Sequence, residues 1–142
     1  MKAMKLVKGR SALIANGDTL FKIDVHYLTG FHSLSGSACT LGLKPMKNFD
    51  RYGVVDLDND KRIISFKEKQ FYMQGNINGG MYVLHKKKFL AEEFPEKFSF
   101  EKDYLEKNVE RLRMFGIVHN AYFIDIGIPE DYERAQRELI QE

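Results

Sequence analysis

Leu13-Ile14-Ala15-Asn16-Gly17-Asp18 is the stretch from which the architecture of this chain is best predicted. Its three apolar residues are typical of the end of a buried strand, Asn16-Gly17 favours a turn, and Asp18 follows at the exit. The segment Tyr122-Phe123-Ile124-Asp125-Ile126-Gly127 has the same order of apolar strand, aspartate and glycine. Ligands of open α/β sheets bind outside the carboxyl ends of strands. We therefore predict that Asp18 and Asp125 meet and hold one divalent cation, although each aspartate alone is more typical of a turn or a helix cap.

Working outward from these two units, strand and helix patterns alternate along the chain, which predicts an α/β fold with a mixed sheet flanked by helices. The hairpin, residues 52–57 and 62–67, supplies an antiparallel part. Expected strands cover residues 12–15, 38–43, 77–84, 114–118 and 121–124, and expected helices cover 25–35 and 86–93 and begin near Ser99 and at Pro129. We expect Pro45 to close the second strand, and Tyr132, Ala135 and Leu139 to pack on the sheet.

The bulk composition indicates one ordinary globular domain. The chain has 142 residues, a net charge of +2 and a hydrophobic fraction of 44%. That charge is too small to argue for nucleic acid or an anionic membrane surface as a partner. No apolar run approaches the ~18 residues of a membrane span, and no secretory signal pattern is present, which favours a cytoplasmic location. Residues 1–10 are basic and expected to be poorly ordered, and residues 11–142 are expected to form a single α/β domain.

The sequence does not match several common motifs of metal-binding, nucleotide-binding or catalytic sites. Asp56-Leu57-Asp58-Asn59-Asp60 lacks the glycine and the final glutamate of a calcium loop, and its position at the hairpin tip favours a solvated turn over a glycosyltransferase metal site. No P-loop, dinucleotide-binding glycine motif or serine nucleophile elbow occurs. Lys67-Glu68-Lys69 is either an exposed charged strand end or a site where Lys69 meets a phosphate and Glu68 accepts hydrogen bonds from sugar hydroxyls.

Taken together and in order, five short motifs resemble the sugar-1-phosphate nucleotidyltransferases. The five motifs are Asn16-Gly17-Asp18, Tyr52-Gly53-Val54-Val55, Phe66-Lys67-Glu68-Lys69, residues 77–83 and residues 122–132. A further segment, Ser99-Phe100-Glu101-Lys102-Asp103, is most similar to the branch of heptose 1-phosphate guanylyltransferases and the related mannose-1-phosphate enzymes. The resemblance covers nearly all of residues 11–140 and implies the C-terminal portion of a Rossmann-like nucleotide-diphospho-sugar transferase fold.

The resemblance also implies roles for individual residues. Asp18 and Asp125 match the two carboxylates that bind Mg²⁺ and serve catalysis. Lys69 matches the lysine that holds the sugar-linked phosphate, whereas Glu68 and Asn78 match contacts to sugar hydroxyls. Gly17 falls at a substrate-binding position, and Gly53 and Gly79 match positions where the backbone lies against the sugar, so close contact with substrate would explain both glycines.

One part of the family pattern is missing. These enzymes begin with a Gly-x-Gly-Thr-Arg loop that binds the nucleoside triphosphate, and this chain contains only Gly9-Arg10 ahead of its first strand. The resemblance therefore implies a truncated transferase, most similar to the guanylyl enzymes, that is weak or inactive alone and uses GTP only if the missing half is supplied. The alternative is a non-catalytic sugar-phosphate-binding module or partner subunit. Sheet edges left uncovered by the missing part predict a homo-oligomer.

Overall fold

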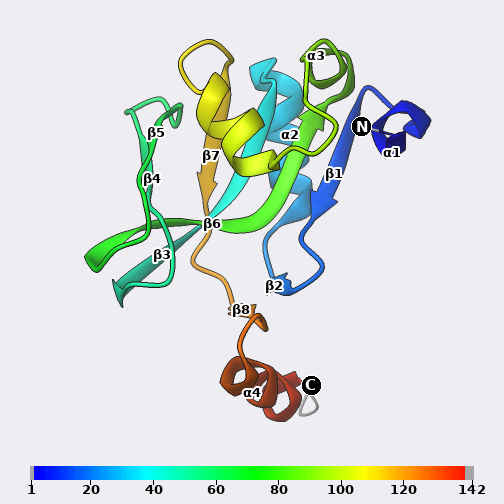
Figure 1. The fold of residues 1–142 in the computed structure, drawn as a ribbon. Coiled ribbons are helices and arrows are strands. Elements are labelled where there is room, and N and C mark those ends of the chain that lie inside the picture. Colours follow the sequence, from blue (N-terminus) through cyan, green and yellow to red (C-terminus); the bar gives the residue numbers. More distant parts are fainter. Residues whose placement is uncertain (1, 140–142) are drawn as a thin grey trace.

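The computed structural model describes residues 2–139 and has a four-stranded mixed sheet at its centre (Figure 1). The strand order is β1-β6-β3-β7, in which β6 runs antiparallel to its neighbours β1 and β3, and β7 runs parallel to β3. These strands are β1 (Ser11–Ala15), β3 (Cys39–Phe49), β6 (Tyr72–His85) and β7 (Met114–Val118). The expected α/β fold with a mixed sheet is confirmed.

Two small sheets and five helical segments complete the fold of residues 2–139. The small sheets pair β2 (Thr19–Phe21) with β8 (Phe123–Asp125), and β4 (Val55–Leu57) with β5 (Ile63–Phe66). The helical segments are α1 (Lys2–Leu6), α2 (Val25–Ser35), α3 (Lys86–Leu90), a π-type segment η1 (Phe100–Glu106) and α4 (Pro129–Leu139). The β4–β5 pair confirms the predicted hairpin.

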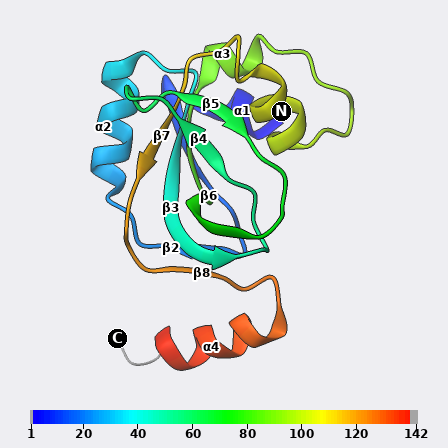
Figure 2. The ribbon, with the colours of Figure 1, turned by 90° about the vertical axis from the view of Figure 1, so that its left-hand side faces the viewer.

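The central sheet has a hydrophobic core on each face because its side chains alternate. Along β6, Val83 packs in the cluster that contains Leu28 of α2, whereas Tyr82 and Leu84 pack with Tyr104 of η1. Figure 2 shows α2 on one side of the sheet and η1 on the other.

Local capping signals place the helix boundaries as predicted. The Asp24 carboxylate accepts a hydrogen bond from the Tyr27 N–H at 2.9 Å and begins α2, and Gly36 ends it with φ of 62°. The Ser99 hydroxyl accepts a hydrogen bond from the Lys102 N–H at 3.2 Å at the start of η1.

Three expectations about element lengths differ from the structure. The predicted closure at Pro45 is wrong, because β3 continues to Phe49. Beyond Leu43 only β6 pairs with β3, so proline lies where one side of the strand has no partner within residues 2–139. β6 likewise begins at Tyr72 rather than at Ile77. Near the N-terminus, Lys2–Leu6 is helical and Met4 is buried in the core, in contrast to the poorly ordered segment expected.

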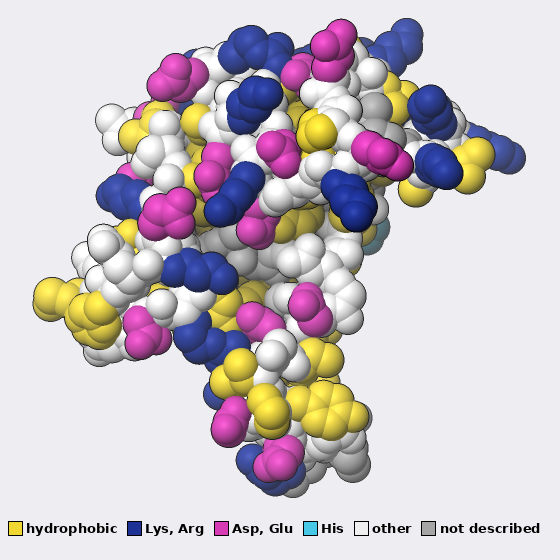
Figure 3. All heavy atoms as spheres, in the orientation of Figure 1, with side chains coloured by type: hydrophobic (Ala, Val, Ile, Leu, Met, Phe, Trp, Pro, Cys, Tyr) yellow, Lys and Arg dark blue, Asp and Glu magenta, His cyan; other side chains and the backbone are white. Residues whose placement is uncertain are grey.

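α4 does not pack on the central sheet as predicted. It extends from the body and lies against β8 (Figure 1). Ala135 is buried, but Tyr132 and Leu139 remain 52% and 38% exposed. Figure 3 shows hydrophobic side chains gathered on this projection. None of the helices within residues 2–139 has both the length and the apolar character to cross a membrane.

Candidate functional site

The pairing of β2 with β8 brings Asp18 and Asp125 close together although 107 positions separate them in sequence. Thr19, directly after Asp18, lies opposite Asp125 in this antiparallel pair. The Ile126 N–H also donates to the carbonyl oxygen of Asp18 at 2.9 Å. Both aspartates line one cleft of about 260 Å³. The structure therefore brings the two predicted carboxylates to a shared cavity.

The same cleft collects most of the residues singled out from the sequence. Asp18, Gly53, Glu68, Lys69, Asn78 and Asp125 all line it. Gly17 and Gly79 do not line it, although both adjoin residues that do. The lining comes from the β1–β2 turn, the hairpin, the middle of β6, η1 and β8, so segments from the whole length of the chain contribute to it.

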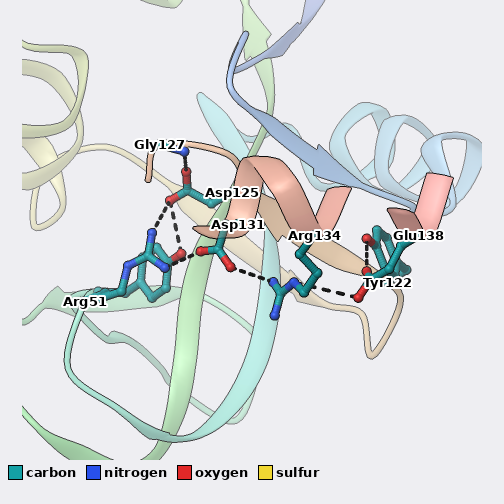
Figure 4. A network of polar contacts seen from close by, with 8 residues as sticks. Arg51, Tyr122, Asp125, Gly127, Asp131, Arg134 and Glu138 are labelled. Atoms are coloured by element: carbon teal, nitrogen blue, oxygen red, sulfur yellow. Dashed lines mark hydrogen bonds and ion pairs between the residues drawn. The ribbon is translucent and has the colours of Figure 1, made fainter. Parts of the chain in front are cut away.

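Asp125 is held by donors on both of its carboxylate oxygens (Figure 4). The Gly127 N–H donates to Oδ1 at 2.8 Å, and the Tyr52 hydroxyl donates to Oδ2 at 3.0 Å. The Arg51 guanidinium lies 3.8 Å from the same Oδ2. Burial, and then the hydrogen bond to Asp125, raises the pKa of Tyr52 to about 12, so this hydroxyl stays protonated and able to donate at neutral pH.

Arg51 also connects this side of the site to α4. Its guanidinium pairs with Asp131, whose other carboxylate oxygen lies 3.0 Å from Arg134 (Figure 4). The hydrogen bond to Asp131 raises the pKa of Arg51. Since α4 otherwise contacts mainly β8, this ionic chain fixes the helix beside Asp125.

On the hairpin side of the cleft, the two lysines of Lys67-Glu68-Lys69 differ in what they contact. The Lys67 ammonium lies 2.8 Å from the Asp56 carboxylate, and the hydrogen bond to Asp56 raises its pKa. Lys69 makes no ion pair within residues 2–139 and is exposed at the cleft. Of the two, Lys69 is the cation available to a phosphate.

A bulge in the centre of β6 shapes the floor of the cleft. Gly42 pairs with Met81 while Leu43 pairs with Asn78, so Gly79 and Gly80 are extra residues on β6. Gly80 has φ of 76° and its N–H donates to Asn78 Oδ1 at 3.0 Å. Asn78 Nδ2 in turn donates to the Tyr82 hydroxyl at 2.9 Å. The bulge therefore fixes the Asn78 amide at the cleft.

The reason for two glycines differs from the one expected. A Cβ on Gly53 would lie 2.2 Å from the Lys67 carbonyl oxygen, and one on Gly79 would lie 2.3 Å from the ring of Phe21. Packing of the protein against itself thus already requires both glycines, so contact with a sugar is not needed to explain them.

Some residues of the site were missed by the sequence argument. Tyr52 and Glu101 line the cleft, but the sequence argument included them only as members of motifs that resemble the family and gave neither a role. Arg51 carried no signal at all, because its role depends on Asp125 and Asp131, which are more than 70 positions away. A polar residue next to a motif glycine was the only local signal that could have drawn attention to Tyr52.

The chemistry of the cleft suits an oxygen-binding cation and a phosphate. Asp18 and Asp125 supply hard carboxylate oxygens, and Asp125 keeps a lone pair on each oxygen beyond those used by Gly127 and Tyr52. Within the described part of the chain, no group of three or more His, Cys, Asp or Glu side chains could hold a metal. A two-carboxylate site completed by phosphate oxygens and water is typical of Mg²⁺.

Comparison with known proteins agrees with these features. A family model described as nucleotidyl transferase matches residues 1–142. A D-glycero-alpha-D-manno-heptose 1-phosphate guanylyltransferase of Aneurinibacillus thermoaerophilus is 48% identical over 138 residues, 97% of this chain and 60% of the relative. Another protein of that name, from Campylobacter jejuni, is 46% identical over 131 residues, 92% of this chain and 57% of the relative.

A solved structure gives the same picture in three dimensions. The crystal structure of HddC from Yersinia pseudotuberculosis has a TM-score of 0.78 and 35% sequence identity, and the match covers 97% of this chain and 59% of that protein. HddC has also been solved in complex with GMP-PN. The chain therefore spans about 60% of the length of these two guanylyltransferase relatives.

Proposed function

The chain belongs to the nucleotidyl transferase family, and from that premise we propose that it is the sugar-phosphate-binding part of a sugar-1-phosphate guanylyltransferase. The observation that carries the proposal is the cleft in which Asp18, Asp125, Lys69, Glu68 and Asn78 are gathered from distant parts of the chain. The names of the heptose 1-phosphate guanylyltransferase relatives support the choice of a heptose or mannose-type sugar phosphate and of GTP.

In the proposed reaction, a phosphate oxygen of the sugar 1-phosphate attacks the α-phosphorus of GTP. A new P–O bond forms, the bond from the α-phosphorus to the bridging oxygen breaks, and pyrophosphate leaves with that electron pair. No protein nucleophile is needed, so positioning and charge neutralisation supply most of the catalysis. Bound Mg²⁺, held by Asp18 and Asp125, would neutralise phosphate charge.

The remaining residues of the cleft are assigned to substrate positioning. Lys69 would pair with the phosphate of the sugar 1-phosphate, and Glu68 and Asn78 would contact sugar hydroxyls. Tyr52 would keep the Asp125 carboxylate oriented through the bond to Oδ2. Gly53 would let the backbone approach the substrate, and Gly17 and Gly79 would act beside the cleft, next to residues that line it.

Activity of this chain alone is proposed to be weak or absent. Its 142 residues contain no Gly-x-Gly-Thr-Arg sequence to hold a nucleoside triphosphate. A second candidate is a non-catalytic module that binds sugar phosphate for regulation or for a separate nucleotide-binding chain. For either function we propose a cytoplasmic location and neither nucleic-acid nor membrane partners.

Calorimetric titration with D-mannose 1-phosphate and with D-glycero-D-manno-heptose 1-phosphate, each with Mg²⁺, tests the proposal. We expect binding that Lys69→Met and Asp125→Asn each weaken at least about tenfold, since Lys69 would pair with the phosphate and Asp125 would hold the Mg²⁺ that neutralises it. Lys107→Met and Asp60→Asn are the matched controls, because both residues are exposed and neither lines the cleft. Equal affinity of all four variants would contradict the site.

Turnover separates the two candidate functions. In a longer chain that includes these residues and a nucleotide-binding loop, we expect GTP-dependent release of pyrophosphate that Asp125→Asn abolishes. Activity of that variant near the parent's would exclude the assignment of Asp125. Binding of sugar phosphate with no turnover in the longer chain would favour the module.

A further inference from the structure

A second cavity lies at the other end of β1 from the cleft, and every ionisable residue that lines it is basic. It measures about 220 Å³ and is lined by Arg10, Ser11, His32, Ser33, Gly36, His85 and Lys88. Ser11 is the first residue of β1, whereas Asp18 follows the last, so the length of the strand separates the two cavities. No residue of the proposed transferase site lines this second cavity.

The positive charges of this cavity have no negative partner in the described part of the chain. Arg10 and His85 form no ion pair there. The Lys88 ammonium donates to the Gly36 carbonyl oxygen at 2.6 Å, which is a neutral acceptor. A cavity with an uncompensated positive potential attracts anions from solution.

The floor of the cavity is rigid and polar. The His32 ring is 2% exposed, its Nε2 lies 3.1 Å from the Ser11 hydroxyl, and its Nδ1 lies 2.9 Å from the hydroxyls of Thr40 and Ser37. Burial, then repulsion by His85 and Lys88, lowers the pKa of His32 to about 4. Burial, then repulsion by Lys88 and Arg10, also lowers the pKa of His85. Repulsion by neighbouring basic groups is thus the smaller cause of both shifts, and Arg10 and Lys88 carry the positive charge of the cavity at neutral pH.

We propose that this cavity binds a small phosphate-type oxyanion, held by the guanidinium of Arg10, the ammonium of Lys88 and the imidazole of His85. The oxygens of a phosphate accept several hydrogen bonds at once, which suits a forked guanidinium beside a compact ammonium. The small volume favours inorganic phosphate or the phosphate group of a small monoester over a bulky ligand.

A competing explanation is that the basic residues only stabilise the carboxyl end of α2. His32 lies in the last turn of that helix and Lys88 reaches the carbonyl of its capping residue Gly36. Arg10 makes no such contact, so it is the residue whose replacement distinguishes the two explanations.

The test is an NMR titration of the protein with inorganic phosphate at constant ionic strength, following the ring signals of His85. We expect saturable binding that raises the pKa of His85, because a bound anion stabilises the imidazolium. Arg10→Met should weaken phosphate binding about fivefold or more, since a charged partner is lost. Lys97→Met is the charge-matched control, because Lys97 is exposed and does not line the cavity.

Equal phosphate affinity in the parent, Arg10→Met and Lys97→Met would overturn the proposal, as would an unchanged pKa of His85. If Lys88→Met lowers the melting temperature while phosphate still binds as in the parent, Lys88 serves α2 alone and the proposed anion contact is wrong. Lys69→Met should leave the His85 response intact, so this result does not depend on the proposed transferase site.

Discussion

At the scale of single residues, the burial of His32 links the stability of the fold to pH. Its pKa is lowered from 6.5 to about 4, chiefly by burial, so between these values the unfolded chain binds a proton that the native state does not. The stabilisation is therefore complete above pH 6.5 and declines as the pH falls toward 4. At ~1.4 kcal/mol per pH unit, we expect a loss of about 3 kcal/mol.

Urea unfolding at a series of pH values measures this effect in the parent and in His32→Gln. The variant should lose the part of the pH dependence that lies between 4 and 6.5, because glutamine does not titrate. His26→Gln removes an exposed imidazole of the same helix and should follow the parent. Identical pH profiles for His32→Gln and the parent would refute this explanation.

The residues of the candidate site that could be predicted from sequence are those whose signal is local. Asp18 and Asp125 each follow an apolar strand, and a glycine lies directly before Asp18 and two residues after Asp125. This local pattern is typical of the end of a strand. Arg51 and Tyr52 could not be assigned, because their partner Asp125 becomes a neighbour only when β2 and β8 pair. A contact between segments so distant in sequence leaves no pattern in either one.

The same distinction applies at the scale of elements. The helix boundaries at Asp24, Gly36 and Ser99 were predictable, because they depend on a φ angle or on hydrogen bonds between residues three positions apart. The extent of β3 past Pro45 depends on its pairing with β6, and the position of α4 depends on β8. Propensity and amphipathic spacing do not tell which surface a helix meets, and the tertiary contacts decided both cases.

The close approach of the hairpin to Gly53 leads to a prediction at the same scale. In Gly53→Ala the new Cβ would lie 2.2 Å from the Lys67 carbonyl oxygen, so the strand end that carries Glu68 and Lys69 must move. We expect a loss of about 1–3 kcal/mol in the free energy of unfolding. Urea denaturation measures it.

Gly17→Ala is the matched control for that experiment. Gly17 has no heavy atom within 4 Å of an added Cβ, so its substitution should change the free energy of unfolding by less than about 0.5 kcal/mol. A Gly53→Ala protein as stable as Gly17→Ala would show that the hairpin adjusts freely, and that its position does not determine the shape of the cleft.

At the scale of the whole molecule, the central sheet separates two chemically different ends. β1, β3 and β7 run in the same direction, and the turn that follows β1 lines the cleft with its carboxylates, whereas Ser11 at the amino end of β1 lines the basic cavity. α2 and η1 lie on opposite faces of the sheet (Figure 2), and the cleft opens beside η1 at the middle of β6. The edges of the sheet are surfaces through which the molecule can associate.

The two edges of the central sheet differ, and this difference predicts how the chain self-associates. The outer edge of β7 is covered by the hairpin tip, since the Gly116 N–H donates to the Lys61 carbonyl at 3.0 Å and Arg62 bridges to Phe115. No strand within residues 2–139 covers the outer edge of β1, and Leu13 on that strand is 45% exposed. An open edge with an exposed apolar side chain favours pairing with another chain, so we expect a homodimer or larger oligomer by light scattering.

Leu13→Lys should shift the population toward monomer, because a charge on an edge strand opposes pairing. Leu34→Lys, which changes a leucine that is 91% exposed on α2, should not. A parent protein that is monomeric at high concentration would contradict the prediction, and equal association of the two variants would place the interface elsewhere than at β1.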